Sequence, residues 1–158
     1  MPVSVVSPLR LSGVTPPLRA LVRAALAEEG RRPGEVAVVL ADDAALRDLN
    51  RRWRGLDRAT DVLSFAYDDG SGETVDGDLA ISLERVREQA RRFRVTRGGE
   101  LARLVVHGAL HLAGLDHQGA AERRHMRARE DRVLRGAREA VAALDQALTP
   151  WPGPGRPG

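Results

Sequence analysis

Three histidines stand close together in the segment HGALHLAGLDH, residues 107–117. His107 and His111 are four residues apart, so on a helix their side chains would lie on one face. Gly114 can adopt a left-handed conformation that ends this helix and turns the chain, which would bring His117 near the other two. Neutral imidazoles are common ligands of zinc, and three of them leave a fourth position for water. The spacing therefore predicts a metal site of the catalytic type, with all three histidines as ligands.

The alternative interpretation is that these are ordinary histidines of an apolar helix. It suits a single histidine better than this group, because three of the chain's 4 histidines fall within this one segment. His125 has no partner at ligand spacing, so we expect it at the surface. For Asp116 two roles stay open: it orients a ligand or holds the bound water, or it caps the turn.

Gly108 occupies the position at which a metalloprotease with this histidine spacing carries a glutamate. That glutamate acts as the general base on the water that the metal binds. A glycine has no side chain for this task, so peptide hydrolysis loses its central group unless an Asp or Glu from elsewhere replaces it.

The composition of the chain limits which metal ligands, compartments and partners are possible. The chain has no cysteine, which excludes disulfides and thiolate ligands and leaves His, Asp and Glu for a metal. No apolar run approaches the roughly 18–20 residues that span a bilayer, and residues 1–13 lack the features of a signal peptide, so we expect a cytoplasmic protein without a membrane partner. All 25 positively charged side chains are arginines, against 22 acidic ones. Guanidinium groups bind phosphate well, which permits a nucleic-acid partner without establishing one.

The pattern of apolar and turn-forming residues predicts alternating strands and helices. We expect strands over residues 2–8, 35–41, 60–67 and 78–82, the last antiparallel to the one before it, and helices over 16–30, 43–53, 83–93, 100–114 and 120–148. Asp42, Ser82 and Thr96 are candidate N-caps. In the second helix we expect Leu46, Leu49 and Trp53 on the inner face. Gly136 is a candidate break in the long last helix.

These elements indicate an α/β (or α+β) fold with a small mixed sheet of about four strands flanked by five or so helices. The chain is long enough for a single domain, which we expect to be a metal-dependent hydrolase domain over residues 1–148. The Pro/Gly-rich residues 149–158 would form a disordered tail.

Three motifs in order along the chain closely resemble the YbeY family of bacterial rRNA-maturation endoribonucleases. They are NRRWRGLDRATDVLSF (50–65), GDLAIS (77–82) and LVVHGALHLAGLDH (104–117). The resemblance extends from about Val36 to Met126. It implies one divalent transition metal per chain, with zinc expected, held by His107, His111 and His117. It also implies a functional arginine at Arg54, and the strand TDVLSF would border the site with Thr60 near its mouth.

The activity that the resemblance implies is cleavage of single-stranded RNA, including maturation of the 16S rRNA 3′ end and ribosome quality control. The expected partners are an rRNA precursor and the small ribosomal subunit or its assembly factors. Arg54 would stabilise charge on the phosphate, alongside a metal bound by His107 and His111. Because the chain has only two Phe, one Tyr and two Trp, we expect base stacking to contribute little.

Two other classes of function stay open. A metalloprotease-like zinc hydrolase would cleave casein and leave single-stranded RNA intact. A non-catalytic ribosome-assembly factor would hold a structural metal, and a fourth protein ligand in place of water would identify it.

Overall fold

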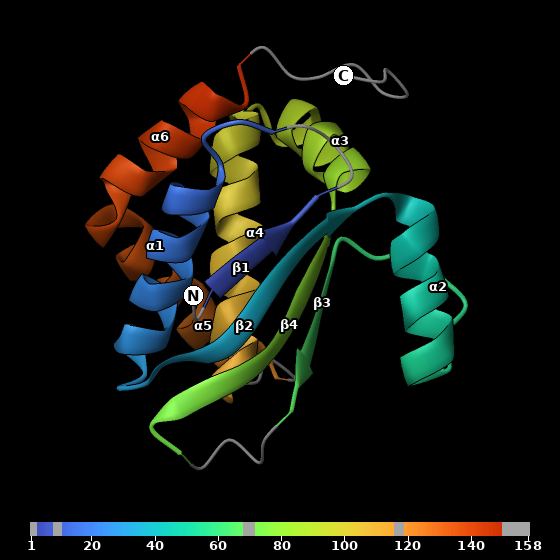
Figure 1. The fold of residues 1–158 in the computed structure, drawn as a ribbon, viewed down its shortest axis with the longest axis horizontal. Helices are drawn as coiled ribbons and strands as arrows, with labels where there is room; N and C mark the ends of the chain where they lie inside the picture. The colour runs from blue at the N-terminus through green and yellow to red at the C-terminus, as the bar shows by residue number, and fades with distance from the viewer. Residues whose placement is uncertain (1–2, 8–10, 68–71, 116–118, 150–158) are drawn as a thin grey trace.

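The computed structural model describes residues 3–7, 11–67, 72–115 and 119–149, which form one sheet covered by helices (Figure 1). The elements in chain order are β1 (Val3–Val6), α1 (Thr15–Glu28), β2 (Arg32–Ala41), α2 (Asp43–Arg54), β3 (Val62–Ala66), β4 (Thr74–Ser82), α3 (Leu83–Phe93), α4 (Arg97–Leu112), α5 (Ala120–Gly136) and α6 (Arg138–Ala147). The predicted fold class is confirmed, with a mixed sheet of 4 strands in this part of the chain.

The sheet has the strand order β1-β2-β4-β3. The first three strands in this order are parallel, whereas β3 pairs antiparallel with β4 and forms an edge of the sheet. The antiparallel pairing of the last two strands was predicted correctly. Two strands are longer than expected: β2 begins at Arg32 and β4 at Thr74, because residues 32 and 33 pair with residues 74 and 75. Residues 74–77 thus extend the strand that was predicted over 78–82.

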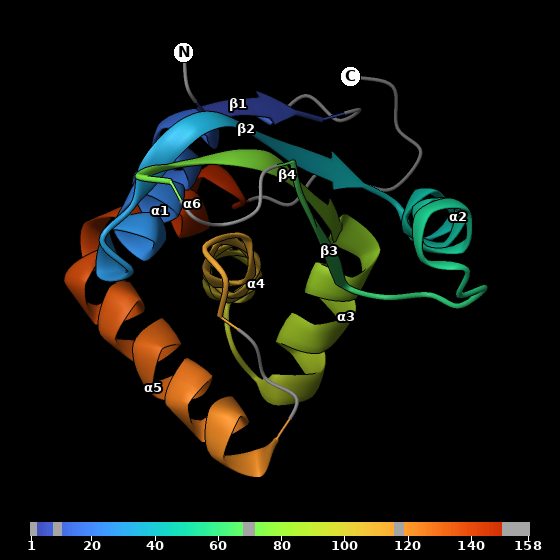
Figure 2. The same ribbon diagram turned by 90° about the horizontal axis from the view of Figure 1, so that it is seen from below.

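The main core lies between one face of the sheet and the helices α1, α3, α4, α5 and α6 (Figure 2). Alternate residues of β2 point into it, as expected for a strand buried on this side. Its largest fully buried side chains include Leu18, Leu21, Leu26, Leu40, Leu79, Ile81, Leu101, Leu104 and Leu110. Helix α4 passes through the middle of this layer, and most of its length is buried. The helix that carries the histidines is thus held on several sides.

Helix α2 packs against the opposite face of the sheet, where Leu46, Leu63 and Ala80 form a smaller buried cluster. Leu46 confirms the predicted inner face of this helix, but the prediction for Trp53 is wrong, since its side chain is 68% exposed. Within the described ranges, α2 is the single helix on this face, so no second layer covers the indole. Asn50 is buried instead, and its side-chain amide donates to the carbonyl of Arg58 at 3.1 Å.

Three helices begin directly after the residues predicted as their N-caps, and two predicted helix ends are also present. The side chains of Asp42, Ser82 and Thr96 accept hydrogen bonds from backbone N–H groups three residues ahead, which stabilises the starts of α2, α3 and α4. Gly114 has φ +107° just after α4, as the turn required. The predicted break near Gly136 is also confirmed, because α5 ends there and α6 begins at Arg138.

Among the described residues no helix is both long and apolar enough to cross a membrane. The tail predicted over residues 149–158 lies outside the described residues, except for Thr149.

Candidate metal centre and adjoining cleft

Helix α4 places His107 and His111 one turn apart on its face toward β3. Their ring centroids are 4.8 Å apart and the ring planes meet at 70°. Both side chains are half-buried, and both line a cleft of about 730 Å³. The pairing predicted from the i, i+4 spacing is therefore present in the structure, at the wall of a cleft large enough for a ligand.

Glu130 of α5 lies against His107, with Oε2 2.6 Å from Nδ1 of the imidazole. The carboxylate is buried, with only 7% of the residue exposed. A carboxylate in this position orients a metal-binding histidine and leaves Nε2 as the nitrogen that can bind a metal. The sequence analysis did not select Glu130. Its spacing from Met126 and Val133, which face the core, is the one signal that could have found it.

The donor set fits a metal such as zinc, because two imidazoles lie on adjacent turns and one of them is anchored by a carboxylate. The third predicted ligand, His117, and its neighbour Asp116 lie outside the described residues. In the parts of the chain that the structure describes, no three His, Asp or Glu side chains gather closely enough to hold a metal ion. The metal site with three histidine ligands therefore stays a prediction.

The cleft beside the histidines is walled by β3 and by the segment that joins α2 to β3. Arg54, Thr60 and Asp61 contribute to this wall. Thr60 is half-buried there, and its hydroxyl lies 3.5 Å from the carbonyl of Val62. Asp61 is the one acidic residue among the described lining residues, and the sequence analysis did not select it.

Arg54 ends α2 and reaches across to the outer edge of β3. Its Nη2 donates to the carbonyl of Ser64 at 2.5 Å, and its guanidinium lies 5.3 Å from the centroid of the Phe65 ring. Gly55, with φ +69°, ends the helix in the left-handed conformation and turns the chain toward the cleft. These contacts hold the arginine at the histidine cleft while its side chain stays exposed.

Gly108 lies on the side of α4 that packs against the sheet. A Cβ at this position would lie 2.9 Å from Cδ2 of Leu79 and 3.2 Å from Cγ2 of Val62. The Ser64 hydroxyl also donates to the Gly108 carbonyl at 3.1 Å. The glycine therefore allows the close packing of α4 on β3 and β4, and a side chain here would force Leu79 and Val62 to shift. A glutamate here would overpack this layer, which disfavours the base of a metalloprotease at this position.

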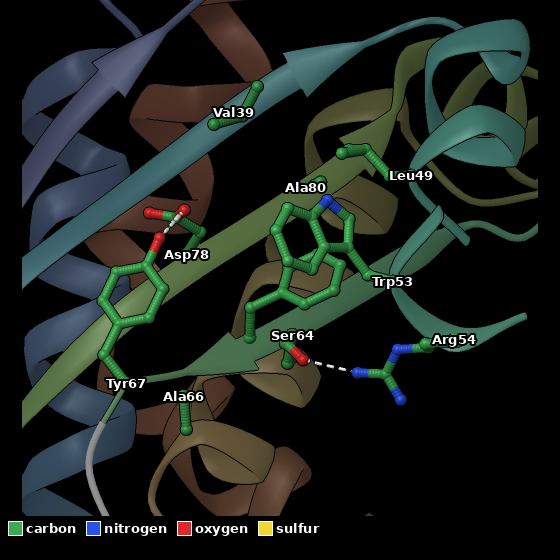
Figure 3. Close-up of a pocket in the computed structure, with 10 residues that line it drawn as sticks. Val39, Leu49, Trp53, Arg54, Ser64, Ala66, Tyr67, Asp78 and Ala80 are labelled. Carbon is green, nitrogen blue, oxygen red and sulfur yellow. Dashed lines mark hydrogen bonds between the residues drawn. The ribbon is translucent and has the colours of Figure 1, made fainter. Parts of the chain in front are cut away.

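A second pocket of about 750 Å³ adjoins the first on the other face of β3 (Figure 3). We call it the aromatic pocket, because Trp53, Phe65 and Tyr67 line it. The Tyr67 hydroxyl donates to the carboxylate of Asp78 on the pocket wall, as Figure 3 shows. Arg54 and Ser64 line both this pocket and the histidine cleft.

Fold and site together define a small α/β protein whose central helix offers paired histidines to a cleft with an arginine on its wall. Comparison with known proteins identifies the family to which this protein is similar. The family model described as "Endoribonuclease YbeY" matches residues 14–138. A protein of that name from Anaeromyxobacter sp. (strain Fw109-5) is 43% identical over 129 residues, which cover 80% of this chain and 67% of the relative. Another from Roseiflexus sp. (strain RS-1) is 44% identical over 141 residues, covering 77% and 88%.

Among solved structures, the solution structure of TM1509 from Thermotoga maritima is similar along almost its whole length. Its TM-score is 0.64 with 26% sequence identity, and the match covers 98% of this chain and 99% of that one. The chain belongs to the endoribonuclease YbeY family. The resemblance first suggested by the three sequence motifs is confirmed.

Proposed function

We propose that this chain is a metal-dependent endoribonuclease that cleaves single-stranded RNA, and that it acts in 16S rRNA 3′-end maturation and ribosome quality control. One observation supports this more than any other: His107 and His111 line the same cleft as Arg54, in a chain that belongs to an endoribonuclease family. The proposed partners are an rRNA precursor and the small ribosomal subunit or its assembly factors, in the cytoplasm. The hydrolase domain would comprise residues 1–148, with a disordered tail over 149–158.

The metal, for which we propose zinc, would be held by His107, His111 and His117. When bound, it supplies Lewis-acid stabilisation of negative charge on the phosphate oxygens. Glu130 fixes the ring of His107 through Nδ1, so the ligand nitrogen is oriented before the metal arrives. Asp116 would add a further contact to a ligand or to bound water.

Arg54 would bind the phosphate that is cleaved. Its guanidinium is anchored through Nη2 on Ser64, which leaves its remaining N–H groups to donate to phosphate oxygens. Charge builds on these oxygens as the phosphodiester breaks, and a positioned guanidinium stabilises it. Thr60, at the cleft wall, would contact the substrate beside it.

A proton acceptor is also needed, because the attacking hydroxyl loses its proton as the new P–O bond forms and the leaving oxygen gains one. We assign this role to Asp61, the acidic residue on the described cleft wall. The products identify the nucleophile. Attack by the 2′-oxygen leaves a 2′,3′-cyclic phosphate, whereas attack by water leaves a linear phosphate.

The test combines metal analysis with an RNase assay on an rRNA precursor. His111→Ala should abolish metal binding and RNA cleavage together. His125→Ala is the matched control, since this histidine is exposed and does not line the cleft, and it should retain both properties. Cleavage of RNA by a metal-free His111→Ala variant would refute the proposal. Cleavage of casein with no action on single-stranded RNA would favour the metalloprotease instead.

A further inference from the structure

The aromatic pocket adjoins the histidine cleft, but Trp53, Phe65 and Tyr67 have no role in the chemistry proposed above. Its volume of about 750 Å³ is in the range of small-ligand sites. Figure 3 shows Trp53 on one side of the pocket and Tyr67 on the other, with Asp78 on the strand between them. The two aromatic side chains therefore border the pocket on opposite sides.

Two of the three aromatic side chains that line this pocket are largely exposed. Trp53 is 68% and Tyr67 66% exposed, although the whole chain has only five aromatic residues of the Phe, Trp and Tyr types. Phe65 is a third member, half-buried beneath the guanidinium of Arg54. Exposed aromatic side chains beside a cationic group are typical of sites that bind single-stranded nucleic acid, because each base can stack on a ring.

The pocket is continuous with the histidine cleft around the edge of the sheet. Side chains alternate along β3, so Ser64 faces α4 and the histidines, while Phe65 faces α2 and Trp53. Because β3 is an edge strand of the sheet, no other strand among the described residues separates the two sites. Arg54 lies at the junction and lines both. A strand of RNA with a phosphate at Arg54 can therefore place the next base on the far side of β3.

Asp78 adds a polar group to the pocket. One carboxylate oxygen accepts the Tyr67 hydroxyl, and the described residues offer no partner to the other. A carboxylate accepts hydrogen bonds from the amino or imino N–H groups of nucleobases. Stacking together with such an acceptor would hold a base of any type, since each has a flat face and at least one N–H donor.

We infer that the aromatic pocket binds one unpaired nucleobase of the RNA, adjacent to the phosphate held at Arg54 in the histidine cleft. The inference rests on the proposed function for its substrate class. It reverses the expectation from composition that stacking contributes little. Few aromatic residues are present, but three of them gather at one place beside the cleft.

The experiment uses the full chain with Trp151→Phe, which leaves Trp53 as the single tryptophan. The probe is a short 2′-O-methylated single-stranded oligonucleotide, chosen to slow cleavage. Binding should quench the fluorescence of Trp53, since a base stacks on the indole. In separate anisotropy titrations with the native chain, Trp53→Ala should weaken binding about fivefold or more, while Trp53→Phe should retain most of the affinity.

Phe93→Ala is the matched control, because Phe93 is a 54% exposed aromatic residue on α3 that does not line the pocket. It should leave the affinity unchanged. An abasic residue moved along the oligonucleotide should weaken binding to the native chain at one position, and that loss should vanish in Trp53→Ala. Equal losses in both proteins, or an unchanged affinity in Trp53→Ala, would overturn the inference.

The outcomes separate this inference from the proposed function. A chain that binds RNA through Trp53 but cleaves none would contradict the endoribonuclease proposal and support the pocket. A chain that cleaves RNA with the same KM after Trp53→Ala would do the reverse.

Discussion

The imidazole of His107 and the carboxylate of Glu130 lie 2.6 Å apart, Nδ1 to Oε2, and join helices α4 and α5 beside the cleft. Glu130 is almost completely buried, so the contact is shielded from water. A buried carboxylate that holds one nitrogen of a histidine selects the other nitrogen as the ligand and limits rotation of the ring. The metal affinity of the site should therefore depend on a residue that does not itself bind the metal.

Glu130→Ala should lower the affinity for Zn²⁺ by about 10–100-fold, since the ring of His107 loses its orienting partner. Competition with a chromophoric chelator measures the affinity directly, without an activity assay. The Zn²⁺ affinity of Glu130→Gln should lie between those of the native chain and Glu130→Ala, because the amide oxygen of the glutamine can still accept from Nδ1. Asp131→Asn, an exposed carboxylate on the same helix, is the control. An unchanged affinity in Glu130→Ala, with the fold intact, would contradict the orienting role.

Arg54→Glu should reduce kcat for RNA cleavage by about a hundredfold, because a group that stabilises developing charge is replaced by one that repels the phosphate. Metal content should stay at the level of the unmodified chain, since Arg54 contacts Ser64 and Phe65 but neither histidine. Arg52→Glu makes the same change of charge on the same exposed helix, yet Arg52 does not line the cleft. Its kcat should change much less. Loss of metal in Arg54→Glu would show that the arginine is structural.

The parts of the site that the sequence predicted are those that depend on local periodicity. His107 and His111 lie together because residues four apart always share a face of a helix, and the caps at Asp42, Ser82 and Thr96 are equally local. The antiparallel pairing of β3 with β4 was also predicted, because the two strands follow one another directly in the chain.

The parts that the sequence did not predict depend on how distant elements pack. Glu130 is one charged residue in a helix with charges on most sides, and only the packing of α5 on α4 brings it to His107. Trp53 has the spacing of an inner-face residue, but nothing in the local sequence indicates that α2 is the single described helix on this face of the sheet. The close approach of Gly108 to Leu79 likewise joins residues far apart in the chain.

Gly108→Ala should destabilise the protein, although alanine favours a helix more than glycine by about 1 kcal/mol. The added methyl group would lie 2.9 Å from Leu79 and 3.2 Å from Val62 in a well-packed layer, and overpacking of this kind costs about 1–3 kcal/mol. We expect a net loss of roughly 1 kcal/mol in the free energy of unfolding, measured by urea denaturation.

Gly136→Ala provides the matched control for this prediction, because a Cβ there would meet no atom within 4 Å and its φ is not positive. It should stabilise the chain by about 0.4–1 kcal/mol. The two substitutions are therefore expected to have opposite signs. A gain of stability in both would mean that α4 is not packed as closely on β3 and β4 as the structure shows.

Tyr67 is the single tyrosine of the chain, so the near-ultraviolet absorbance of tyrosinate reports on it alone. The hydrogen bond to Asp78 raises the pKa of Tyr67, with smaller contributions from burial and from the charge of this carboxylate. The absorbance titration should therefore have its midpoint above the ordinary value of about 10. In Asp78→Asn the midpoint should return toward this value, because the hydroxyl loses its hydrogen bond to a carboxylate and ionisation no longer places two negative charges together.

The raised pKa of Tyr67 determines how the contribution of the Tyr67–Asp78 contact to stability changes with pH. The folded state binds the tyrosine proton more tightly than the unfolded state, so the contact stabilises the fold below about pH 10 and is lost as the pH rises through the folded-state pKa. The destabilisation caused by Asp78→Asn should accordingly be larger at neutral pH than above the midpoint of Tyr67. Equal midpoints in the two proteins would show that the hydroxyl does not pair with Asp78 in solution, and the wall of the aromatic pocket would then lack this anchor.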